Sequence, residues 1–247
     1  MSLSDFFIQH PKAAIAFSGG VDSAYLLYAA HLAGADIAAY YVKSAFQPRF
    51  ELEDAKKFCA LLDIPLHIIP LDILRCAEIT ANSTERCYHC KCAIFSAIAD
   101  AAKADGYALL LDGTNASDAA SERPGMRALR ELSVRSPLRE CGLTKEEIRR
   151  RSREAGLFTW DKPAYACLAT RIPTGDAITA EKLRAAEQAE GFLFSLGFRD
   201  FRVRRMGDSA RLQFPADQLG KALEKRECIL NELKKYYASV LLDLEVR

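Results

Sequence analysis

Over residues 1–160 the apolar and polar residues follow two patterns that take turns along the chain. Short apolar runs bounded by turn residues are typical of buried strands, and apolar residues repeated every three or four positions are typical of helices. The predicted strands are residues 13–17, 37–42, 66–70 and 108–111, and the predicted helices are residues 21–34, 51–62, 91–104 and 145–155. Strands that alternate with helices form βαβ units, so residues 1–160 are predicted to be an α/β domain with a doubly wound parallel sheet.

The pattern changes after residue 160. Residues 161–177 contain prolines and glycines and show no helical periodicity, which indicates a loop and linker. The pattern beyond it predicts helices at residues 179–196 and 217–237 and strands at residues 201–205, 211–214 and 240–244. We therefore expect residues 178–247 to form a small α+β domain.

The composition is that of a globular protein. Of 247 residues, 50% are hydrophobic and 27% are charged, which excludes a disordered chain. No apolar run approaches the roughly 20 residues that span a bilayer, and the N-terminus does not resemble a signal peptide. The formal net charge of +1 gives no overall attraction to nucleic acid. We expect a cytoplasmic homo-oligomer that contacts neither membrane nor nucleic acid and whose partner is a small molecule.

The string SGGVDS joins the first predicted strand to the first predicted helix. At such a junction, backbone N–H groups and the helix dipole form an anion site. Gly19 and Gly20 allow a close approach of the backbone, and the hydroxyls of Ser18 and Ser23 are further donors. Asp22 can hold a magnesium ion or orient the loop. The lysine of a Walker loop is absent, so cleavage of a bond other than that to the γ-phosphate is expected.

A second polar segment, Asp112-Gly113-Thr114-Asn115, follows the fourth predicted strand. The carboxyl ends of parallel strands meet at one edge of a sheet, where α/β domains bind ligands. We expect a second nucleotide or metal contact there. The alternative is a simple turn, because Asp-Gly and Asn are turn residues.

Eight cysteines are many for a reducing compartment, where disulfides are rare. Cys87 and Cys90 have the C-x-x-C spacing that lets two thiolates reach one metal or iron–sulfur cluster. Cys92, His89 or Cys167 would have to complete the ligand set. The alternative is the start of a helix whose thiols bind nothing. Four isolated cysteines are predicted to be small core residues, namely Cys59, Cys76, Cys141 and Cys228.

Cys167 lies in the predicted loop, between Lys162 and Arg171. Neighbouring positive charges stabilise a thiolate and so lower the pKa of a cysteine. We interpret Cys167 as a reactive sulfur.

Basic residues concentrate in the two short strands near the C-terminus. Arg202 and Arg204 share one face of a strand, and Arg199, Arg205 and Arg211 lie nearby. A guanidinium group can bind a phosphate bidentately, through two parallel N–H···O hydrogen bonds, so a phosphate site is expected. The alternative is an edge strand whose charges prevent pairing with another chain. The mixed charges of residues 145–153 are interpreted as a solvated helix surface.

The SGGVDS string resembles the loop of the PP-loop ATP pyrophosphatase superfamily, which holds the pyrophosphate released when ATP adenylates a substrate. Further segments together resemble the LarE family: residues 85–91, 112–115, 123–125, 135–138, 161–163, 166–173 and 202–204. This resemblance covers nearly the whole chain. It implies an adenine nucleotide alpha hydrolase-like fold and an ATP-dependent sulfur transferase in the synthesis of the nickel-pincer cofactor of lactate racemase.

The resemblance also implies roles for individual residues. The substrate would be a pyridinium dicarboxylate mononucleotide, with its phosphate on Arg171, Arg202 and Arg204. ATP and Mg²⁺ would bind at the two polar segments, with Asp22 as the magnesium ligand. The nucleotide-binding residues would be Ser18, Gly19, Gly20, Asp22, Ser23, Asp112, Gly113 and Thr114.

Two sources of sulfur are compatible with the resemblance. In the sacrificial form Cys167 attacks the adenylate and loses its sulfur, which leaves dehydroalanine after one turnover. In the other form Cys87, Cys90 and Cys167 hold a [4Fe-4S] cluster that carries the sulfur. We favour the cluster because the pair has a spacing suited to cluster ligation. Three departures from the family pattern concern substrate contacts: Thr174 replaces Tyr, Arg205-Met206 replaces a His-rich pair, and Gln213 replaces an acidic residue.

Two other functions are weighed against this one. A transfer-RNA thiolase is disfavoured because the chain has no recognisable RNA-binding module and a net charge near zero. A non-catalytic module would bind ATP without releasing AMP and pyrophosphate.

Overall fold

The computed structural model describes residues 2–118 and 124–247, and they form two compact units. The first unit is the described part of Met1–Ile73 and Glu85–Lys162, and the second is Leu74–Thr84 with Pro163–Arg247. The chain enters the second unit after Lys162, within the segment predicted as a linker. That residues 74–84 belong to the second unit was not predicted from the sequence.

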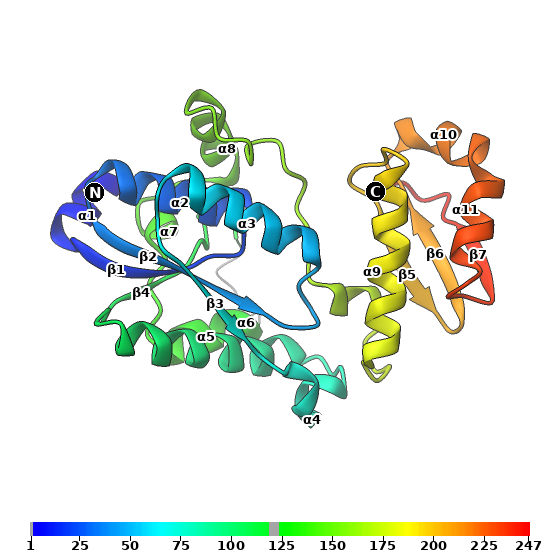
Figure 1. Ribbon diagram of the computed structural model, residues 1–247, viewed down its shortest axis with the longest axis horizontal. Coiled ribbons are helices and arrows are strands. Elements are labelled where there is room, and N and C mark those ends of the chain that lie inside the picture. Colours follow the sequence, from blue (N-terminus) through cyan, green and yellow to red (C-terminus); the bar gives the residue numbers. More distant parts are fainter. Residues whose placement is uncertain (1, 119–123) are drawn as a thin grey trace. The chain divides into compact units, whose positions relative to one another are not determined.

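The first unit is built on a parallel sheet (Figure 1). Its strands are β1 (Lys12–Ala16), β2 (Asp36–Lys43), β3 (Leu66–Pro70) and β4 (Leu110–Leu111), in the order β3-β2-β1-β4. In register, Ala14 of β1 lies opposite Ala38 of β2 and Leu110 of β4. A parallel bridge between Leu111 and Arg135 continues the pairing beyond β4. The predicted doubly wound α/β fold class is confirmed.

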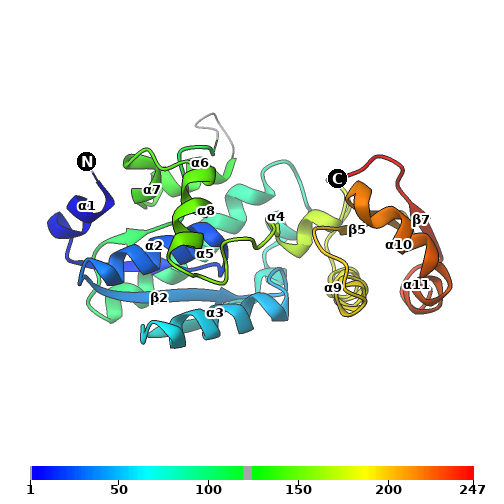
Figure 2. The same cartoon turned by 90° about the horizontal axis from the view of Figure 1, so that it is seen from above.

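Helices cover both faces of this sheet. One face carries α1 (Leu3–Gln9), α2 (Val21–Leu32), α3 (Arg49–Leu61) and α8 (Lys145–Glu154), and the other carries α5 (Arg86–Ala104) and α6 (Pro124–Glu131) (Figures 1 and 2). Each face of the sheet has its own hydrophobic core, and alternate residues of β2 point into one or the other. Tyr41 packs with α2 and α3, whereas Tyr40 packs with α5. Because both faces are buried, the strands read as continuous apolar runs.

The structure contains short helices that the sequence pattern did not predict. Besides α1 and α6 they are α4 (Ala77–Thr80) and α7 (Pro137–Glu140), each too short for apolar periodicity to be recognised. Helix α5 begins at Arg86, five residues before its predicted start. As a result the Cys87/Cys90 pair lies within the first turns of a helix, as the alternative interpretation of this segment expected.

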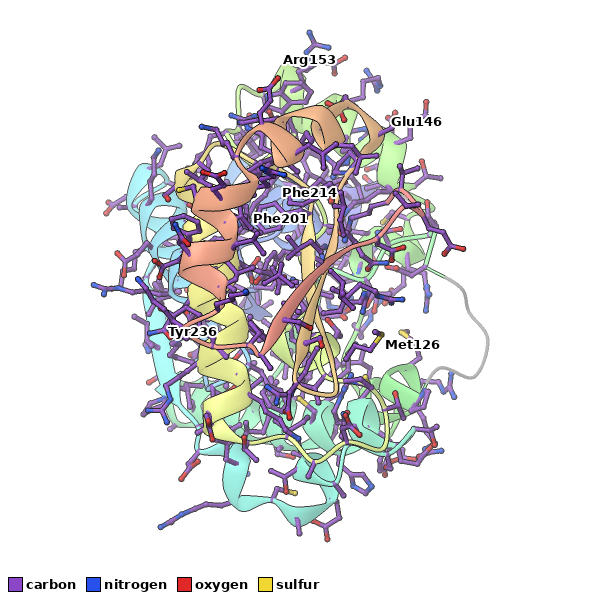
Figure 3. All side chains as sticks on the ribbon, turned by 90° about the vertical axis from the view of Figure 1, so that its right-hand side faces the viewer. Met126, Glu146, Arg153, Phe201, Phe214 and Tyr236 are labelled. Atoms are coloured by element: carbon purple, nitrogen blue, oxygen red, sulfur yellow. The ribbon has the colours of Figure 1, made fainter. Side chains whose placement is uncertain are left out.

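The second unit packs helices on one face of a small mixed sheet (Figures 1 and 2). Strands β5 (Arg202–Met206) and β6 (Ser209–Gln213) form an antiparallel hairpin, and β7 (Ser239–Leu242) pairs in parallel with β6. Helix α9 (Ala180–Ser195) packs beside α11 (Arg226–Leu233). Phe201 and Phe214 lie in the core between them and the sheet, with ring centroids 5.8 Å apart (Figure 3).

The long helix predicted for residues 217–237 is broken. It is replaced by a 3₁₀ turn (Ala216–Gln218), α10 (Leu219–Glu224) and α11. The backbone at Lys225 leaves helical geometry, with φ −93° and ψ 11°. The break folds α10 against α11, which lets Ala222 of α10 and Ile229 of α11 join the core of the second unit.

Residues 74–84 are joined to the second unit by hydrogen bonds around Asn82. This fully buried side chain donates from Nδ2 to the carbonyls of Pro173 (2.7 Å) and Asp176 (3.0 Å). The backbone carbonyl of Asn82 accepts from Gly175 N at 2.9 Å.

Among the described residues no helix is both long and apolar enough to cross a membrane.

Candidate active site

The SGGVDS loop follows β1 and leads into the N-terminus of α2. Gly19 has φ +75°, a left-handed conformation that favours glycine, and a Cβ there would lie 3.1 Å from the carbonyl oxygen of Glu51. Gly20 is the N-cap of α2, and as a glycine it has no side chain to cover the N–H groups of the first turn. These groups, together with the helix dipole, can therefore bind an anion.

Two serine hydroxyls fix the shape of the loop. Ser18 Oγ and Ser23 Oγ lie 3.1 Å apart, and Ser23 Oγ donates to the carbonyl of Gly20 at 3.2 Å. Ser18 N donates in turn to Ser23 Oγ at 3.3 Å. The loop is thus held by contacts within itself.

Asp22 lies in the first turn of α2 and is paired with a lysine from α8. Lys145 Nζ is 2.5 Å from Asp22 Oδ2. Burial raises the pKa of the Asp22 carboxyl, although the hydrogen bond and charge of Lys145 oppose that rise. The second oxygen, Asp22 Oδ1, is buried and has no hydrogen-bond partner within the described residues. A carboxylate oxygen of this kind is the ligand that Mg²⁺ prefers.

The second polar segment lies against the same loop. A Cβ on Gly113 would lie 2.8 Å from Ser23 N, so only glycine fits between β4 and the start of α2. Asp112 is buried and accepts hydrogen bonds from Ser136 Oγ (2.6 Å) and Thr114 Oγ1 (2.5 Å). The structure therefore brings the two predicted nucleotide segments together at the carboxyl edge of the sheet.

These features fit a nucleoside triphosphate with its magnesium ion. The glycines leave space along the backbone, the α2 N-terminus provides N–H donors, and Asp22 Oδ1 provides an unpartnered carboxylate oxygen. That ATP and Mg²⁺ bind at these residues stays a prediction.

Lys162, which the sequence suggested as a positive charge for Cys167, contacts this loop. Its ammonium donates to Gly19 O at 3.1 Å and to Asp54 at 2.6 Å, and its side chain is 14% exposed. That Lys162 also favours the thiolate of Cys167 stays a prediction, since the two residues belong to different units.

Helix α8 is also more than the solvated surface that its mixed charges suggested. Lys145 pairs with Asp22, and Arg149 donates to the carbonyls of Trp160 (2.6 Å) and Lys162 (2.8 Å). Other charged side chains of α8, such as Glu146 and Arg153, do project outward (Figure 3). The interpretation fails for Lys145 and Arg149 because one helix face is turned toward the loop.

Cys87 and Cys90 lie one turn apart on α5, in the first unit. Cys87 is exposed and Cys90 half-buried. Within residues 2–118 and 124–247, no three His, Cys, Asp or Glu side chains gather as a metal site. Two thiols on one helix face can supply two ligands of a cluster, and Cys167, the third ligand expected from the sequence, belongs to the second unit.

The surroundings of this cysteine pair come mainly from α6. Tyr88 Oη donates to Glu131 at 2.6 Å, and the guanidinium of Arg127 lies 4.0 Å from the Tyr88 ring centroid. Gly125 packs on the Lys91 stem, where a Cβ would lie 3.0 Å from Lys91 Cδ. Gly125 belongs to the family motif at residues 123–125, and Arg123, the first residue of this motif, lies outside the described residues.

The isolated cysteines differ in their burial. Cys59 is 2% exposed, which confirms its assignment to the core, and burial raises the pKa of its thiol to about 12. Cys76 and Cys141 are half-buried, and Cys228 is exposed on α11. The core prediction is wrong for Cys228, because a cysteine on a surface helix face has the same sequence signature as a buried one.

Cys167 begins a 3₁₀ turn, Leu168–Arg171, in the second unit. Its carbonyl accepts from Thr170 N (3.0 Å) and Thr170 Oγ1 (2.8 Å), and its side chain is half-buried. The pKa of Arg171 is raised by its bond to Glu190 and, to a lesser extent, by the nearby Cys167, against the effect of burial. The positive charge predicted beside Cys167 is therefore present in Arg171.

A buried network holds the Arg171 guanidinium. Glu190 accepts from Arg171 Nε at 2.7 Å and from Arg171 Nη2 at 3.0 Å, and both side chains are 1% exposed. Glu190 also accepts from Tyr165 Oη (2.5 Å) and Val203 N (2.9 Å). One carboxylate thus joins the reactive loop, α9 and β5.

Arg202 of β5 also contacts the reactive loop. Its guanidinium donates to the carbonyls of Ala164 and Phe201 and lies 5.2 Å from the Tyr165 ring centroid, and the guanidinium of Arg171 lies 4.5 Å from the same centroid. Burial, followed by the charge of Arg171, lowers the pKa of Arg202 to about 10. The contacts of Arg202 thus tie β5 to the backbone of the reactive loop at Ala164.

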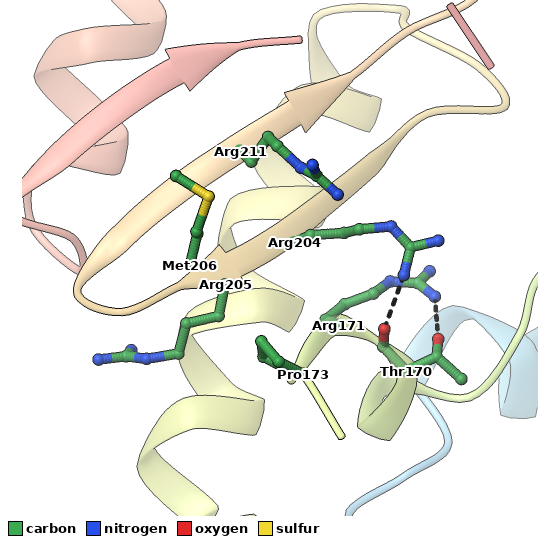
Figure 4. A pocket seen from close by; sticks show the side chains of 7 residues that line it. All are labelled: Thr170, Arg171, Pro173, Arg204, Arg205, Met206 and Arg211. Carbon is green, nitrogen blue, oxygen red and sulfur yellow. Dashed lines mark hydrogen bonds between the residues drawn. The ribbon is translucent and has the colours of Figure 1, made fainter. Parts of the chain in front are cut away.

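An arginine-lined pocket of about 340 Å³ lies beside the 3₁₀ turn (Figure 4). Its wall consists of Thr170, Arg171, Pro173, Arg204, Arg205, Met206 and Arg211. Arg204 donates to Thr170 O at 2.9 Å and to Gln213 Oε1 at 2.6 Å. Gln213 in turn donates to Asp243 at 2.9 Å, so the residue that departs from the family pattern orients Arg204.

The three arginines predicted to bind a substrate phosphate therefore differ. Arg204 and Arg171 line the pocket, but the donors of Arg171 are directed at Glu190, Ala166 and Thr170, and Arg202 does not line the pocket. Phosphate binding by these residues stays a prediction.

Sequence reasoning missed Glu190, Lys145 and Ser136. Glu190 had a visible signal, because it is an acidic residue on the face of α9 that carries Ala186 and Leu193. Ser136 lies in the motif at residues 135–138, although no role was assigned to it, and nothing local distinguishes Lys145 from a surface residue.

A parallel sheet in the order β3-β2-β1-β4 with a glycine-lined SGGVDS loop at its edge defines a PP-loop protein, a class whose members use ATP. Residues 12–91 match the family model described as queuosine biosynthesis protein QueC. An uncharacterized protein of Synechocystis sp. is 36% identical over 99% of this chain and 92% of its own length. An uncharacterized protein of Methanocaldococcus jannaschii is 28% identical over 96% of this chain and 91% of its own.

The pyridinium-3,5-bisthiocarboxylic acid mononucleotide synthase of Lactiplantibacillus plantarum is 31% identical over 94% of this chain and 86% of its own length. This chain therefore belongs to the LarE family, as its motifs predicted.

Proposed function

We propose that this protein is an ATP-dependent sulfur transferase that adenylates a pyridinium carboxylate mononucleotide and replaces AMP with sulfur. The product class is that in the name of the Lactiplantibacillus plantarum relative, and the role is synthesis of the nickel-pincer cofactor of lactate racemase. One observation carries the proposal: a single chain combines a PP-loop with a cysteine whose neighbouring guanidinium is fixed by a buried carboxylate.

The first step uses the residues of the first unit. The α2 N-terminus and the glycines bind the phosphates of ATP, and Asp22 would hold Mg²⁺, which would neutralise phosphate charge. The substrate carboxylate attacks the α-phosphorus and displaces pyrophosphate, which forms an acyl adenylate. Pyrophosphate stays on the N–H groups of the loop, where an anion is stabilised.

The second step uses Cys167. Its thiolate, favoured by Arg171, attacks the acyl carbon and expels AMP, which forms a thioester. Removal of the Cys167 Cα proton then breaks the Cβ–S bond. The electron pair of that bond goes to sulfur, which leaves a thiocarboxylate product and dehydroalanine at position 167.

The sequence pattern favoured the cluster form, but Cys167 is the donor in this proposal because a thiolate beside the fixed Arg171 guanidinium can supply sulfur without any further group. A cluster on Cys87, Cys90 and Cys167 is the alternative source, and one experiment separates the two. Protein purified without oxygen is incubated with ATP and pyridinium-3,5-dicarboxylate mononucleotide, and AMP, pyrophosphate, thiocarboxylate and the intact protein mass are measured.

We expect one thiocarboxylate per protein and a mass loss equal to hydrogen sulfide, localised to Cys167. Cys167→Ala should yield no thiocarboxylate, whereas Cys228→Ala, which removes an exposed cysteine on α11, should behave as wild type. Bound iron and sulfide, repeated turnover and loss of activity in a Cys87→Ala/Cys90→Ala variant would identify the cluster form. A Cys167→Ala protein that still thiolates its substrate would refute both forms.

A further inference from the structure

The SGGVDS loop lacks the lysine with which a Walker loop reaches phosphate. The structure nevertheless brings a lysine to this loop from a point 123 residues later in the chain. Lys145 Nζ lies 2.5 Å from Asp22 Oδ2, in the first turn of α2, and its side chain is 33% exposed. The ammonium is therefore at the anion site and partly accessible to a ligand.

The position of Lys145 is set by the start of α8. Thr144 is the N-cap, with its side chain accepting from Glu147 N, and Lys145 N donates to Ser117 Oγ at 2.9 Å. Helix α8 packs against α2 in the first unit. The backbone of Lys145 is thus fixed while the end of its side chain reaches the PP-loop.

The charges at the loop are incomplete without a ligand. An ammonium has three donors, and one hydrogen bond, to Asp22 Oδ2, is found for Lys145 Nζ in the described part of the chain. Asp22 Oδ1 is buried without a partner there. A phosphate chain with its magnesium ion would complete both, since the metal can bind Asp22 Oδ1 and phosphate oxygens can accept from Lys145.

We propose that Lys145 is a phosphate-binding residue of this site, whose ammonium contacts the pyrophosphate portion of ATP and supplies the lysine charge that the loop lacks. This inference rests on the proposed function, because it assumes that ATP binds at the PP-loop. It adds a residue from α8, outside both polar segments recognised in the sequence.

The alternative role for Lys145 is purely structural, as a counter-ion that neutralises Asp22 and holds α8 to α2. The two roles differ in a double-mutant cycle. If Lys145 only neutralises Asp22, its removal should have no effect on anion binding once Asp22 is also neutral. If Lys145 contacts phosphate, its removal should weaken binding in both backgrounds.

The experiment is calorimetric titration of the full chain with inorganic pyrophosphate, in EDTA and in excess Mg²⁺. The proteins are wild type, Lys145→Gln, Asp22→Asn and Asp22→Asn/Lys145→Gln. Arg150→Gln is the matched control, since it removes one charge from the exposed side of α8, where Arg150 pairs with Glu147 and Glu154.

We expect Lys145→Gln to weaken pyrophosphate binding about tenfold or more, as the loss of a charged hydrogen bond does, in both the wild-type and the Asp22→Asn backgrounds. Arg150→Gln should stay within about twofold of wild type. Unchanged binding in Lys145→Gln, or an effect that vanishes when Asp22 is replaced, would overturn the proposal.

A second measurement needs no variant and so does not depend on whether Lys145→Gln folds. Acetylation of lysines in wild-type protein is mapped by mass spectrometry, with and without pyrophosphate. Protection of Lys145 by pyrophosphate supports the proposal, and equal or greater labelling refutes it. Wild-type protein that binds neither pyrophosphate nor ATP would instead refute the proposed function itself.

Discussion

Glu190 shows how much a single residue decides at the reactive loop. It lies on α9 among small apolar residues, where a carboxylate is costly unless its charge is paired. Arg171, Tyr165 and the backbone of Val203 supply four hydrogen bonds to it. The cost of burying the carboxylate is offset in this way, and the guanidinium beside Cys167 is fixed.

We predict that Glu190→Gln destabilises the protein by about 3 kcal/mol, because breaking a buried pair leaves the charge of Arg171 uncompensated. Urea unfolding followed by circular dichroism measures the loss. Glu181→Gln, on the exposed first turn of the same helix, is the control and should cost at most about 1 kcal/mol. Equal small effects in both variants would show that the network does not stabilise the loop.

Helix α8 shows that one element can serve both surface and site. Arg150 and Glu147 form exposed pairs along it, whereas Lys145 and Arg149 are turned toward the PP-loop and the Trp160–Lys162 backbone. The i, i+4 spacing of Lys145 and Arg149 places both on one face. The helix therefore connects the start of α2 with the backbone that leads toward Cys167.

The ion pairs of Glu147 on the exposed face of α8 should make the stability of the protein depend on pH. Hydrogen bonds from Arg150 and then Arg151 lower the pKa of Glu147 from its ordinary 4.5 to about 2. Because the carboxyl pKa is lower in the folded protein, its stabilisation is complete above about pH 4.5 and is lost as the pH falls toward 2.

Thermal unfolding of wild type and Glu147→Gln between pH 7 and 2 provides the measurement. The variant should unfold at a lower temperature at pH 7, and the two proteins should converge near pH 2. A difference that stays constant over this range would mean that the ion pairs of Glu147 contribute nothing.

At the scale of the whole molecule, residues 74–84 are the least expected feature. They lie in sequence between the two segments of the first unit yet belong to the second unit, through Asn82 and the hydrogen bond from Ile178 N to Thr80 O. The second unit is therefore discontinuous. Residues 163–247 alone lack the chain that satisfies the carbonyls of Pro173 and Asp176.

We predict that Asn82→Ala destabilises the second unit by about 1–3 kcal/mol, since it removes the buried side-chain amide that donates to the carbonyls of Pro173 and Asp176, with a further cost because φ at residue 82 is +55°. Hydrogen exchange should rise throughout residues 163–247. Asn231→Ala, on the exposed face of α11, is the control and should leave exchange unchanged. Unaltered exchange in Asn82→Ala would contradict the discontinuous unit.

The sequence by itself determined the α/β class, the strands of the parallel sheet and the PP-loop. Each of these depends on local pattern: apolar runs buried on both faces, and glycines where the backbone must turn sharply, as at Gly19. The motifs also determined the family. Short helices such as α4 and α7 escaped because three or four residues carry no periodicity.

Only the tertiary structure decided which charges meet. The members of the pairs Lys145 with Asp22, Arg171 with Glu190, and Lys162 with Asp54 are separated by 123, 19 and 108 residues. The pairing energy of two charges depends on their distance and burial, and neither quantity is encoded in local spacing. Lysines and arginines that read alike in the sequence thus become a solvated surface, a loop clamp or a candidate phosphate ligand according to the face that packing turns inward.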